Sequence, residues 1–216
     1  MDMITMIRQL GSGMVVTIQI FMVTLLFALP LGMIIAFGRM SKNIVICSLT
    51  KLYIAIMRGT PLMLQLMVVY FGPYYLFGIK ITSSYRLTAV LIGFVINYAA
   101  YYAEIYRSGF ISIPIGQYEA AKVLGYNKIQ TFLKIILPQV VKRVLPTVTN
   151  EMITLVKDTS LAFVIAVSEM FTQAQKIASA QTTMTPFIIA AIFYFIFNCV
   201  IAYGMERVEK KLNYYQ

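Results

Sequence analysis

The chain has 216 residues, 60% of them hydrophobic, a mean hydropathy of +0.79 and a formal net charge of +10. This composition lies outside the range of soluble proteins, and charged residues gather at the ends of long uncharged runs, which predicts one all-α integral membrane domain over residues 1–216. The basic residues are interleaved with those runs and leave no soluble segment long enough for a nucleic-acid-binding module, so we expect no nucleic-acid partner.

Catalysis by this chain is also disfavoured. The sequence contains no His, which removes the usual general base and the commonest metal ligand, and no GxxxxGK[ST] motif that would bind a nucleotide phosphate. We therefore expect no catalytic residue, no metal site and no cofactor bound by the chain itself.

Five apolar runs are predicted to cross the bilayer, whose hydrocarbon core is roughly 30 Å thick. They are residues 13–38, 62–79, 87–106, 139–156 with a short extension to 167, and 186–205. The first run is too long for a signal peptide and no small-residue cleavage site follows it, so we expect it to remain as a span. Residues 39–58 are predicted to form an amphipathic connector, and residues 168–185 a polar loop. Five spans would place the two termini on opposite sides of the membrane.

The distribution of Lys and Arg predicts the orientation. Loops on one side contain thirteen of these residues and loops on the other side only four, with Lys157 assigned to neither. The thirteen are Arg39, Lys42, Lys51, Arg58, Arg107, Lys122, Lys128, Lys134, Lys142, Arg143, Arg207, Lys210 and Lys211. Because cytoplasmic loops carry the excess of positive charge, we predict that the N-terminus is outside and the C-terminus cytoplasmic. Aromatic residues at 70–77, Tyr214 and Tyr215 are interpreted as interfacial belts.

A polar segment over residues 114–138 is predicted to form a cytoplasmic helical hairpin. Pro114 suits the start of its first helix, and Glu119 lies close enough to that start to favour the positive end of the helix dipole. Gly125 is expected to end this helix in a left-handed conformation. A polar hairpin projecting from an apolar bundle indicates a docking surface.

The second half of the hairpin has its own signals. Asn127, with Gln130 three residues later, resembles a capping box that begins a second helix. Pro138 is expected to prevent this helix from continuing smoothly into the next span.

Polar residues within the spans are candidates for a substrate pathway. Asn97, Tyr101, Glu104 and Ser108 recur at helical spacing, so they share one face, with Tyr98 beside it. An ionisable residue in a span is costly unless it is paired or solvated. Glu104 is therefore either a partner of Arg107, one turn away, or a ligand for the ammonium group of a substrate.

The end of the run at 139–156 carries a second group of candidates: Lys157, Asp158, Thr159 and Ser160. These residues either line the pathway or hold a break in the helix. Asn150, Glu151 and Glu169 complete the polar residues near the spans, and Asn150 is expected to bond between helices rather than to contact substrate.

The hairpin spacing, EAA, three residues, Gly, nine residues, Ile, one residue, Leu-Pro, resembles the cytoplasmic signature of permease subunits in bacterial and archaeal ATP-binding-cassette (ABC) importers. The sequences MRGTP (57–61), YYAEIYR (101–107), GQ (116–117) and KDTSL (157–161) resemble the branch of this family that imports polar amino acids. The resemblance implies a type I importer permease fold with an EAA coupling hairpin, working by alternating access in the plasma (inner) membrane of a prokaryote.

The same resemblance implies partners. It implies two copies of a cytoplasmic ATPase that bind ATP and Mg, a second permease subunit, identical or paralogous, and an extracytoplasmic amino-acid-binding protein. Small alanines would seat the hairpin in a groove of the ATPase, and the glutamate carboxylate would meet donors there. The residues expected to couple the hairpin to the ATPase are Glu119, Ala120, Ala121, Gly125, Ile135, Leu137 and Pro138.

Two other function classes remain open from the sequence. A self-contained secondary carrier or channel would use Glu104 and Asp158 to couple ions, although no internal repeat is visible. A membrane enzyme has little support, because no activated nucleophile pattern or cluster of metal ligands is present.

Overall fold

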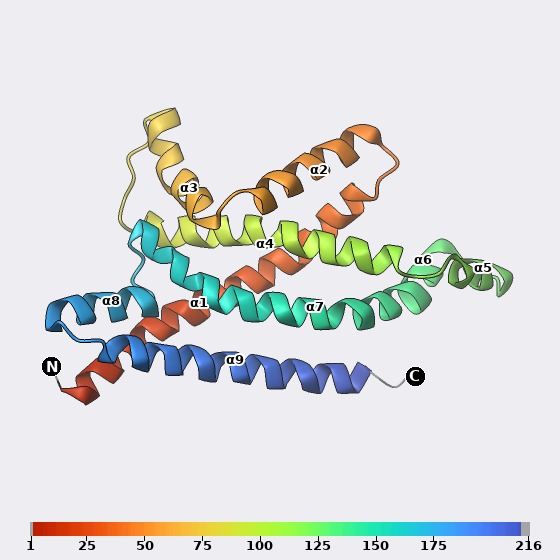
Figure 1. The fold of residues 1–216 in the computed structure, drawn as a ribbon. Helices are drawn as coiled ribbons and strands as arrows, with labels where there is room; N and C mark the ends of the chain where they lie inside the picture. The colour runs from red at the N-terminus through yellow and green to blue at the C-terminus, as the bar shows by residue number, and fades with distance from the viewer. Residues whose placement is uncertain (1, 213–216) are drawn as a thin grey trace.

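The computed structural model describes residues 2–212, which form a bundle of helices without a β-strand in that range (Figure 1). Tyr214 and Tyr215, predicted as part of an aromatic belt, lie outside the described residues. The α-helices are α1 (Met3–Arg39), α2 (Ile44–Gly59), α3 (Leu62–Phe77), α4 (Tyr85–Ile111), α5 (Ile115–Val123), α6 (Lys128–Gln130), α7 (Leu137–Asp158), α8 (Met170–Gln181) and α9 (Thr185–Leu212). A π-helical segment (Thr131–Ile136) precedes α7, and a 3₁₀ helix (Thr159–Ile165) follows it.

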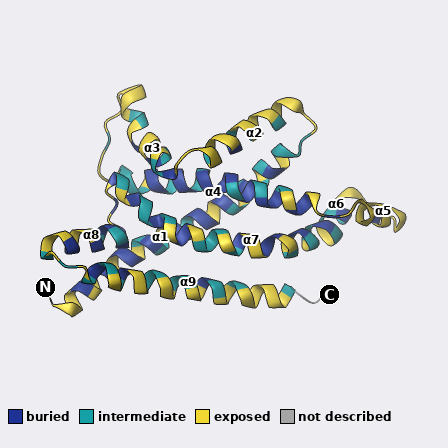
Figure 2. Cartoon of the chain, viewed as in Figure 1, coloured by how far each residue is buried: buried dark blue, intermediate teal, exposed yellow. Residues whose placement is uncertain are grey.

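Helix α4 lies at the centre of the bundle, with α1 crossing it and α7 alongside (Figures 1 and 2). Small residues allow this close approach: Ala99, Ala100 and Ala103 are completely buried. A Cβ atom added to Gly32 of α1 would lie only 2.7 Å from the Cβ atom of Tyr102, so the two helices pack almost backbone to backbone.

The predicted connector at 39–58 is the helix α2, and it joins α3 through a sharp bend of 109°. Asn43 begins α2 by accepting a hydrogen bond from the backbone N–H of Val45 at 2.9 Å. Helix α3 alone has 16 residues, or about 24 Å, which is short of the bilayer core. If α2 and α3 cross the membrane, they do so together, as one broken span.

By length and composition, α1, α4 and α9 are each able to cross a membrane, and the bent α2–α3 pair is a fourth candidate. Helix α7 is long enough, with 22 residues, but it carries charged side chains at both ends and in the middle, including Arg143, Glu151 and Lys157. Length and apolar composition therefore do not confirm the predicted total of five spans. Whether α7 crosses the membrane depends on what covers its polar face.

The predicted loop at 168–185 is wrong, because most of it is the helix α8. The side chain of Glu169 caps this helix by accepting hydrogen bonds from the backbone N–H groups of Phe171 and Thr172, both at 2.7 Å. The helix escaped prediction because its exposed side is polar while Ala174 and Ile177 on the other side pack against the start of α1.

The hairpin confirms two local predictions. Gly125 has a φ of +77° and ends the first helix in the left-handed conformation. Asn127 and Gln130 form a complete capping box, in which each side chain accepts from the backbone N–H of the other residue at 2.9 and 3.0 Å. Glu119, however, is the fifth residue of α5 and not in its first turn, so the predicted dipole interaction is wrong.

Pro138 does not break the helix as predicted. The chain continues helically from α6 through the π-helical segment into α7, and the N–H of Leu137 reaches back five residues to the carbonyl of Phe132. The wider π turn accommodates a residue that has no N–H to donate. The second half of the hairpin is thus the start of one long helix that continues as α7.

Gly32→Ala is expected to lower the thermal unfolding midpoint of the detergent-purified protein. The added methyl group forces α1 away from α4, and such overpacking typically costs about 1–3 kcal/mol. Gly11→Ala is the matched control, because it lies in the same helix with nothing within 4 Å of the added Cβ. The control should gain the ordinary helix preference of alanine, about 0.5–1 kcal/mol. Equal shifts in the two variants would contradict the proposed packing.

Candidate functional site

A polar cavity of about 470 Å³ lies between the α2–α3 bend, the middle of α4 and the end of α7. Its walls are formed by Thr60, Pro61, Leu62, Asn97, Tyr98, Tyr101, Glu151, Thr154, Asp158 and Leu161. The structure therefore brings together four of the eight predicted pathway residues, which come from two helices far apart in the sequence. We refer to this cavity as the central pocket.

A hydrogen bond between α4 and α7 closes one side of the central pocket. The hydroxyl of Tyr98 donates to Oδ2 of Asp158 at 2.7 Å. Tyr98 is only 2% exposed and stacks on Phe94, so its hydroxyl is held in place. Asp158 retains a second carboxylate oxygen for another donor.

Asn97 connects the α2–α3 bend to α4. Its side-chain amide donates to the carbonyl of Met57 and to Oε1 of Gln65, each at 3.0 Å. Gln65 in turn donates to the carbonyl of Met57 and to the hydroxyl of Thr60. These hydrogen bonds hold the MRGTP segment (57–61) against α4. Asn97 therefore helps to fix the shape of the central pocket.

Glu104 lies outside the central pocket. Arg107 donates to its Oε2 through Nη2 at 2.7 Å and Nε at 2.9 Å, and Nε of Arg39 is 3.8 Å from its Oε1. This geometry favours the pairing interpretation of Glu104 over the substrate-ligand interpretation. The cluster joins the ends of α1 and α4.

The remaining residues of the KDTS group do not line the pocket. The side chain of Lys157 is exposed, and the hydroxyl of Ser160 donates to its carbonyl at 2.7 Å. Thr159 is completely buried and donates to the carbonyl of Val156 at 2.6 Å. These two hydroxyls lie where the α-helix changes to a 3₁₀ helix, immediately after Asp158.

Sequence reasoning missed Glu151, Thr154 and Thr60 as pocket residues. Glu151, Thr154 and Asp158 are separated by three and four residues, so they share one face of α7. The same helical-spacing argument that was applied to residues 87–106 would have found them. Glu151 was noted as a polar residue without a role.

The polar face of α7 continues beyond the pocket. Five exposed polar residues follow one another at intervals of four, three, four and three: Arg143, Thr147, Asn150, Thr154 and Lys157. We refer to these five as the α7 polar stripe. Such a stripe cannot face lipid without cost, so it requires water or another polar protein surface.

The hairpin is attached to the bundle by three phenylalanine rings. Phe37 of α1, Phe110 of α4 and Phe132 of the π-helical segment have pairwise ring-centroid distances of 5.8–5.9 Å. Arg143 also donates to the carbonyl of Ser112, which joins the start of α7 to the end of α4. The hairpin therefore contacts both α1 and α4 directly.

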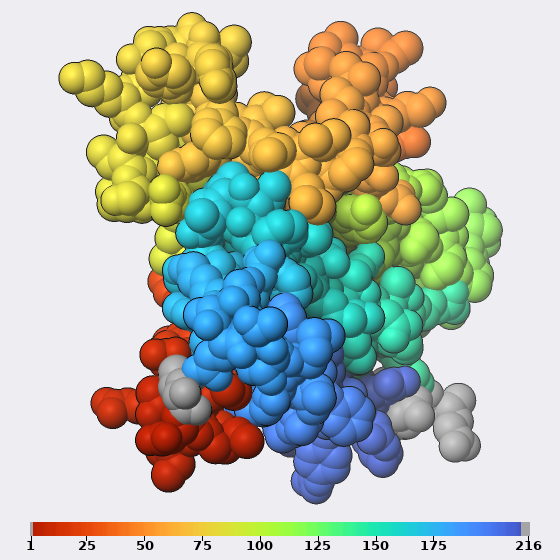
Figure 3. Space-filling view, turned by 60° about the vertical axis from the view of Figure 1, so that its left-hand side comes forward, coloured from red at the N-terminus to blue at the C-terminus, as the bar shows by residue number. Residues whose placement is uncertain are grey.

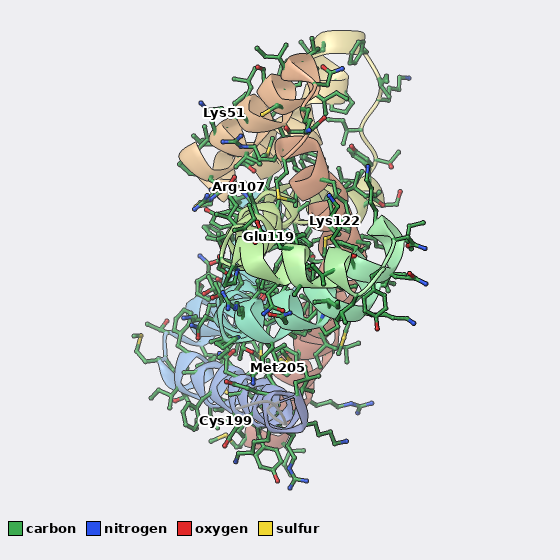
Figure 4. All side chains as sticks on the ribbon, turned by 90° about the vertical axis from the view of Figure 1, so that its right-hand side faces the viewer. Lys51, Arg107, Glu119, Lys122, Cys199 and Met205 are labelled. Atoms are coloured by element: carbon green, nitrogen blue, oxygen red, sulfur yellow. The ribbon has the colours of Figure 1, made fainter. Side chains whose placement is uncertain are left out.

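The hairpin itself projects from one end of the bundle, where Glu119 and Lys122 face outward (Figure 4). It exposes large apolar side chains, among them Val123 at 87% and Leu124 at 72%. Ala120 is exposed, but Ala121 is completely buried inside the hairpin, so it supports the fold and is unavailable for direct contact as the structure stands. Ile135 and Leu137 are partly buried and Pro138 is exposed at the base of the hairpin.

Comparison with known proteins places this geometry in a family. Residues 28–214 match the model of the binding-protein-dependent transport system inner membrane component. A Rickettsia bellii protein named as a glutamine transport system permease is 35% identical over 203 residues, covering 93% of this chain and 91% of the relative. The arginine transport system permease protein ArtQ of Bacillus subtilis is 33% identical, covering 94% and 91%.

Solved structures agree with the sequence comparison. The crystal structure of an amino acid ABC transporter with histidines superposes with a TM-score of 0.86 at 31% identity, covering 98% of this chain and 99% of that one. The inward-facing MetNI methionine ABC transporter shares the fold, with a TM-score of 0.72 at 18% identity, covering 99% and 100%. The chain belongs to the family of inner membrane components of binding-protein-dependent transport systems and is a permease component of an ABC importer.

Proposed function

We propose that this chain imports a polar amino acid with a cationic side chain by alternating access, and that the central pocket is its substrate site. The observation that carries the proposal is the pair of carboxylates on one face of α7, Glu151 and Asp158, which both line the pocket. They lie seven residues apart, or about 10 Å along the helix axis. One carboxylate suits the α-ammonium group of the substrate and the other a side-chain cation.

The substrate α-carboxylate also needs a partner. The guanidinium carbon of Arg58 lies 5.3 Å from the ring centroid of Tyr101, which lines the pocket. Arg58 is exposed and is therefore free to turn toward a bound carboxylate. An amino acid with two positive groups and one negative group thus matches the charges around the pocket.

The energy for transport comes, on this proposal, from two copies of a cytoplasmic ATPase that bind ATP and Mg. Their docking surface is the hairpin, whose exposed apolar side chains and single exposed carboxylate, that of Glu119, suit a groove in a partner. Glu119, Ala120 and Gly125 take part in docking, with Ala121, Ile135, Leu137 and Pro138 supporting the hairpin from within or below. An extracytoplasmic binding protein delivers the amino acid. In this arrangement the N-terminus lies outside the plasma membrane of a prokaryote, and the hairpin lies in the cytoplasm.

The α7 polar stripe supports the presence of a second permease subunit, identical or paralogous. With an apposed subunit, the stripe borders a hydrated path between the two chains instead of lipid. Helix α7 then becomes a span despite its charges. Five spans result, as predicted at 13–38, 62–79, 87–106, 139–156 with a short extension to 167, and 186–205.

The alternative of a self-contained carrier has no support. Glu104, which would couple ions in such a carrier, is paired with Arg107 and does not line the pocket. Family membership also points to the importer.

Glu151→Gln is expected to raise the KM for arginine uptake by about ten- to a hundredfold, because a hydrogen bond to a charged group contributes about 1.5–3 kcal/mol. The measurement is uptake of labelled arginine and labelled glutamine by proteoliposomes that contain the complete transporter. Glutamine uptake should change less, since glutamine has no side-chain charge. Glu209→Gln, an exposed substitution near the end of α9, is the control. An equal loss for both amino acids would argue against recognition of a cationic side chain at Glu151.

Gly125→Val is expected to abolish binding of the ATPase while leaving membrane insertion intact. A β-branched residue resists the left-handed conformation that ends α5, so the reversal of the hairpin is lost. Gly204→Val in α9 is the matched control, because that glycine lacks a positive φ and has nothing within 4 Å of an added Cβ. Coprecipitation of the ATPase with each purified variant provides the measurement, and normal recovery with Gly125→Val would refute the docking role.

A further inference from the structure

A second polar cavity, of about 380 Å³, lies between α4 and α7. Its polar walls are formed by Ser108 and Ser112 of α4 and by Arg143 and Thr147 of α7. We refer to it as the hairpin-side pocket, because the end of α4 and the start of α7 both lead to the hairpin (Figure 1). It shares no residue with the central pocket.

The hairpin-side pocket lies next to the central pocket along the same pair of helices. In α4, Ser108 follows the central-pocket residue Tyr101 by seven positions. In α7, which runs in the opposite direction, Arg143 precedes Glu151 by eight. These offsets correspond to about 10–12 Å along each helix axis. A solute that left the central pocket toward the hairpin between α4 and α7 would therefore enter this second pocket next.

The hairpin-side pocket is open on the side of the α7 polar stripe. Its four polar residues are all exposed, and Arg143 and Thr147 belong to the stripe. Behind them α4 and α7 are in contact, because a Cβ atom added to Gly109 would overlap Cγ1 of Val144. Figure 3 shows the surface of α7 (teal) uncovered next to that of α4 (green). The pocket is thus open to the water or polar surface that the stripe requires.

The α7 wall of this pocket carries donors for an anion. The guanidinium of Arg143 donates through Nη1 to the carbonyl of Ser112, which holds it at the pocket. None of the ion pairs formed within residues 2–212 includes Arg143, so its charge and its other N–H groups are available to a carboxylate. The hydroxyl of Thr147 makes no hydrogen bond in the described part of the chain and can donate as well.

The α4 wall carries acceptors. The hydroxyl of Ser108 donates to the carbonyl of Ile105 at 2.8 Å, and that of Ser112 donates to the carbonyl of Gly109 at 2.7 Å. Both hydroxyl hydrogens are thus used within α4, while lone pairs on the oxygens can accept from a cation. An α-amino acid presents the matching pair of charges, an ammonium group beside a carboxylate.

We propose that the hairpin-side pocket is a second substrate site, which binds the α-carboxylate through Arg143 and Thr147 and the α-ammonium group through the serine hydroxyls. It recognises the head group of the amino acid, whereas the carboxylates of the central pocket match two cations. The inference rests on the proposed function in one respect, that the substrate passes between α4 and α7. Two competing explanations are a general anion site and an arginine that only joins α7 to α4.

The first test is protection of a thiol in the purified complex of permease and ATPase. In a chain with Cys47→Ser and Cys199→Ser, Ser108→Cys places a thiol in the hairpin-side pocket and leaves Ser112 and Arg143 in place. L-Arginine and L-glutamine should both slow its labelling, because both carry the head group. Agmatine, which is arginine without its carboxylate, should not. Equal protection by agmatine or by acetate would overturn the head-group site, and so would a lack of protection by both amino acids.

Substitutions of the donors test their roles. Arg143→Gln should raise the L-arginine concentration that gives half-maximal protection about tenfold or more, and Thr147→Val about threefold. Arg143→Lys keeps the charge and should have a smaller effect. Arg207→Gln is the matched control, because this exposed arginine of α9 lies outside both pockets. If Arg143→Gln lowers the unfolding midpoint but leaves half-maximal protection unchanged, Arg143 only joins the helices and the proposal fails.

A thiol in the central pocket separates this inference from the proposed function. Thr154→Cys in the same background should be protected by L-arginine and by agmatine. Asn150→Cys, on the same helix but outside both pockets, should label at one rate with and without ligand. Protection at position 154 without protection at 108 overturns the second site alone. Protection at 108 without any at 154 refutes the central pocket as a substrate site, while the hairpin-side site stands.

Discussion

The close approach of α1 and α4 is the contact on which the position of every other feature depends. Gly32 and the buried alanines of α4 let the two backbones meet, and aromatic rings then fill the space beside them. Phe94, Tyr98, Tyr102 and Tyr106 follow one another along α4, with ring centroids 6.2–6.4 Å apart. These ring contacts fix the position of Tyr98 along α4. They therefore also fix where its hydroxyl meets Asp158 of α7. The same helix ends in Phe110, which contacts the hairpin.

Helix α7 joins the two functional ends of the molecule. It begins at the hairpin, ends at Asp158 and is about 33 Å long, so movement of the hairpin reaches the pocket without an intervening loop. The π-helical segment at its start replaces the break that Pro138 would otherwise impose. A flexible break there would absorb the displacement produced by a docked ATPase. On the proposed function, the continuity of this helix is thus part of the coupling mechanism.

Local signals correctly predicted the turn and the second helix start of the hairpin. A left-handed glycine and a capping box depend on residues within one or two turns, and both were read correctly from Gly125, Asn127 and Gln130. Helix α8 was missed because the residues that stabilise it are distant in sequence: Tyr194 bonds to its cap and α1 covers its apolar side. Glu151 was missed for a different reason: the helical-spacing argument was applied to residues 87–106 but not to α7, where Glu151 shares one face with Thr154 and Asp158.

The central pocket brings together two half-buried carboxylates, and the positive side chains of Arg58 and Lys157 are exposed and do not line it. Burying such a pair without a cation between them is unfavourable, because both charges lose solvent and repel each other. A bound cationic amino acid offsets this electrostatic cost. The free energy gained on binding depends on how closely α4 and α7 approach the substrate. Substrate charge and helix closure are then energetically linked, so that an empty pocket resists the closed arrangement that a filled one favours. On the proposed function, this linkage lets a chain whose sequence has no GxxxxGK[ST] motif favour closure when substrate is present.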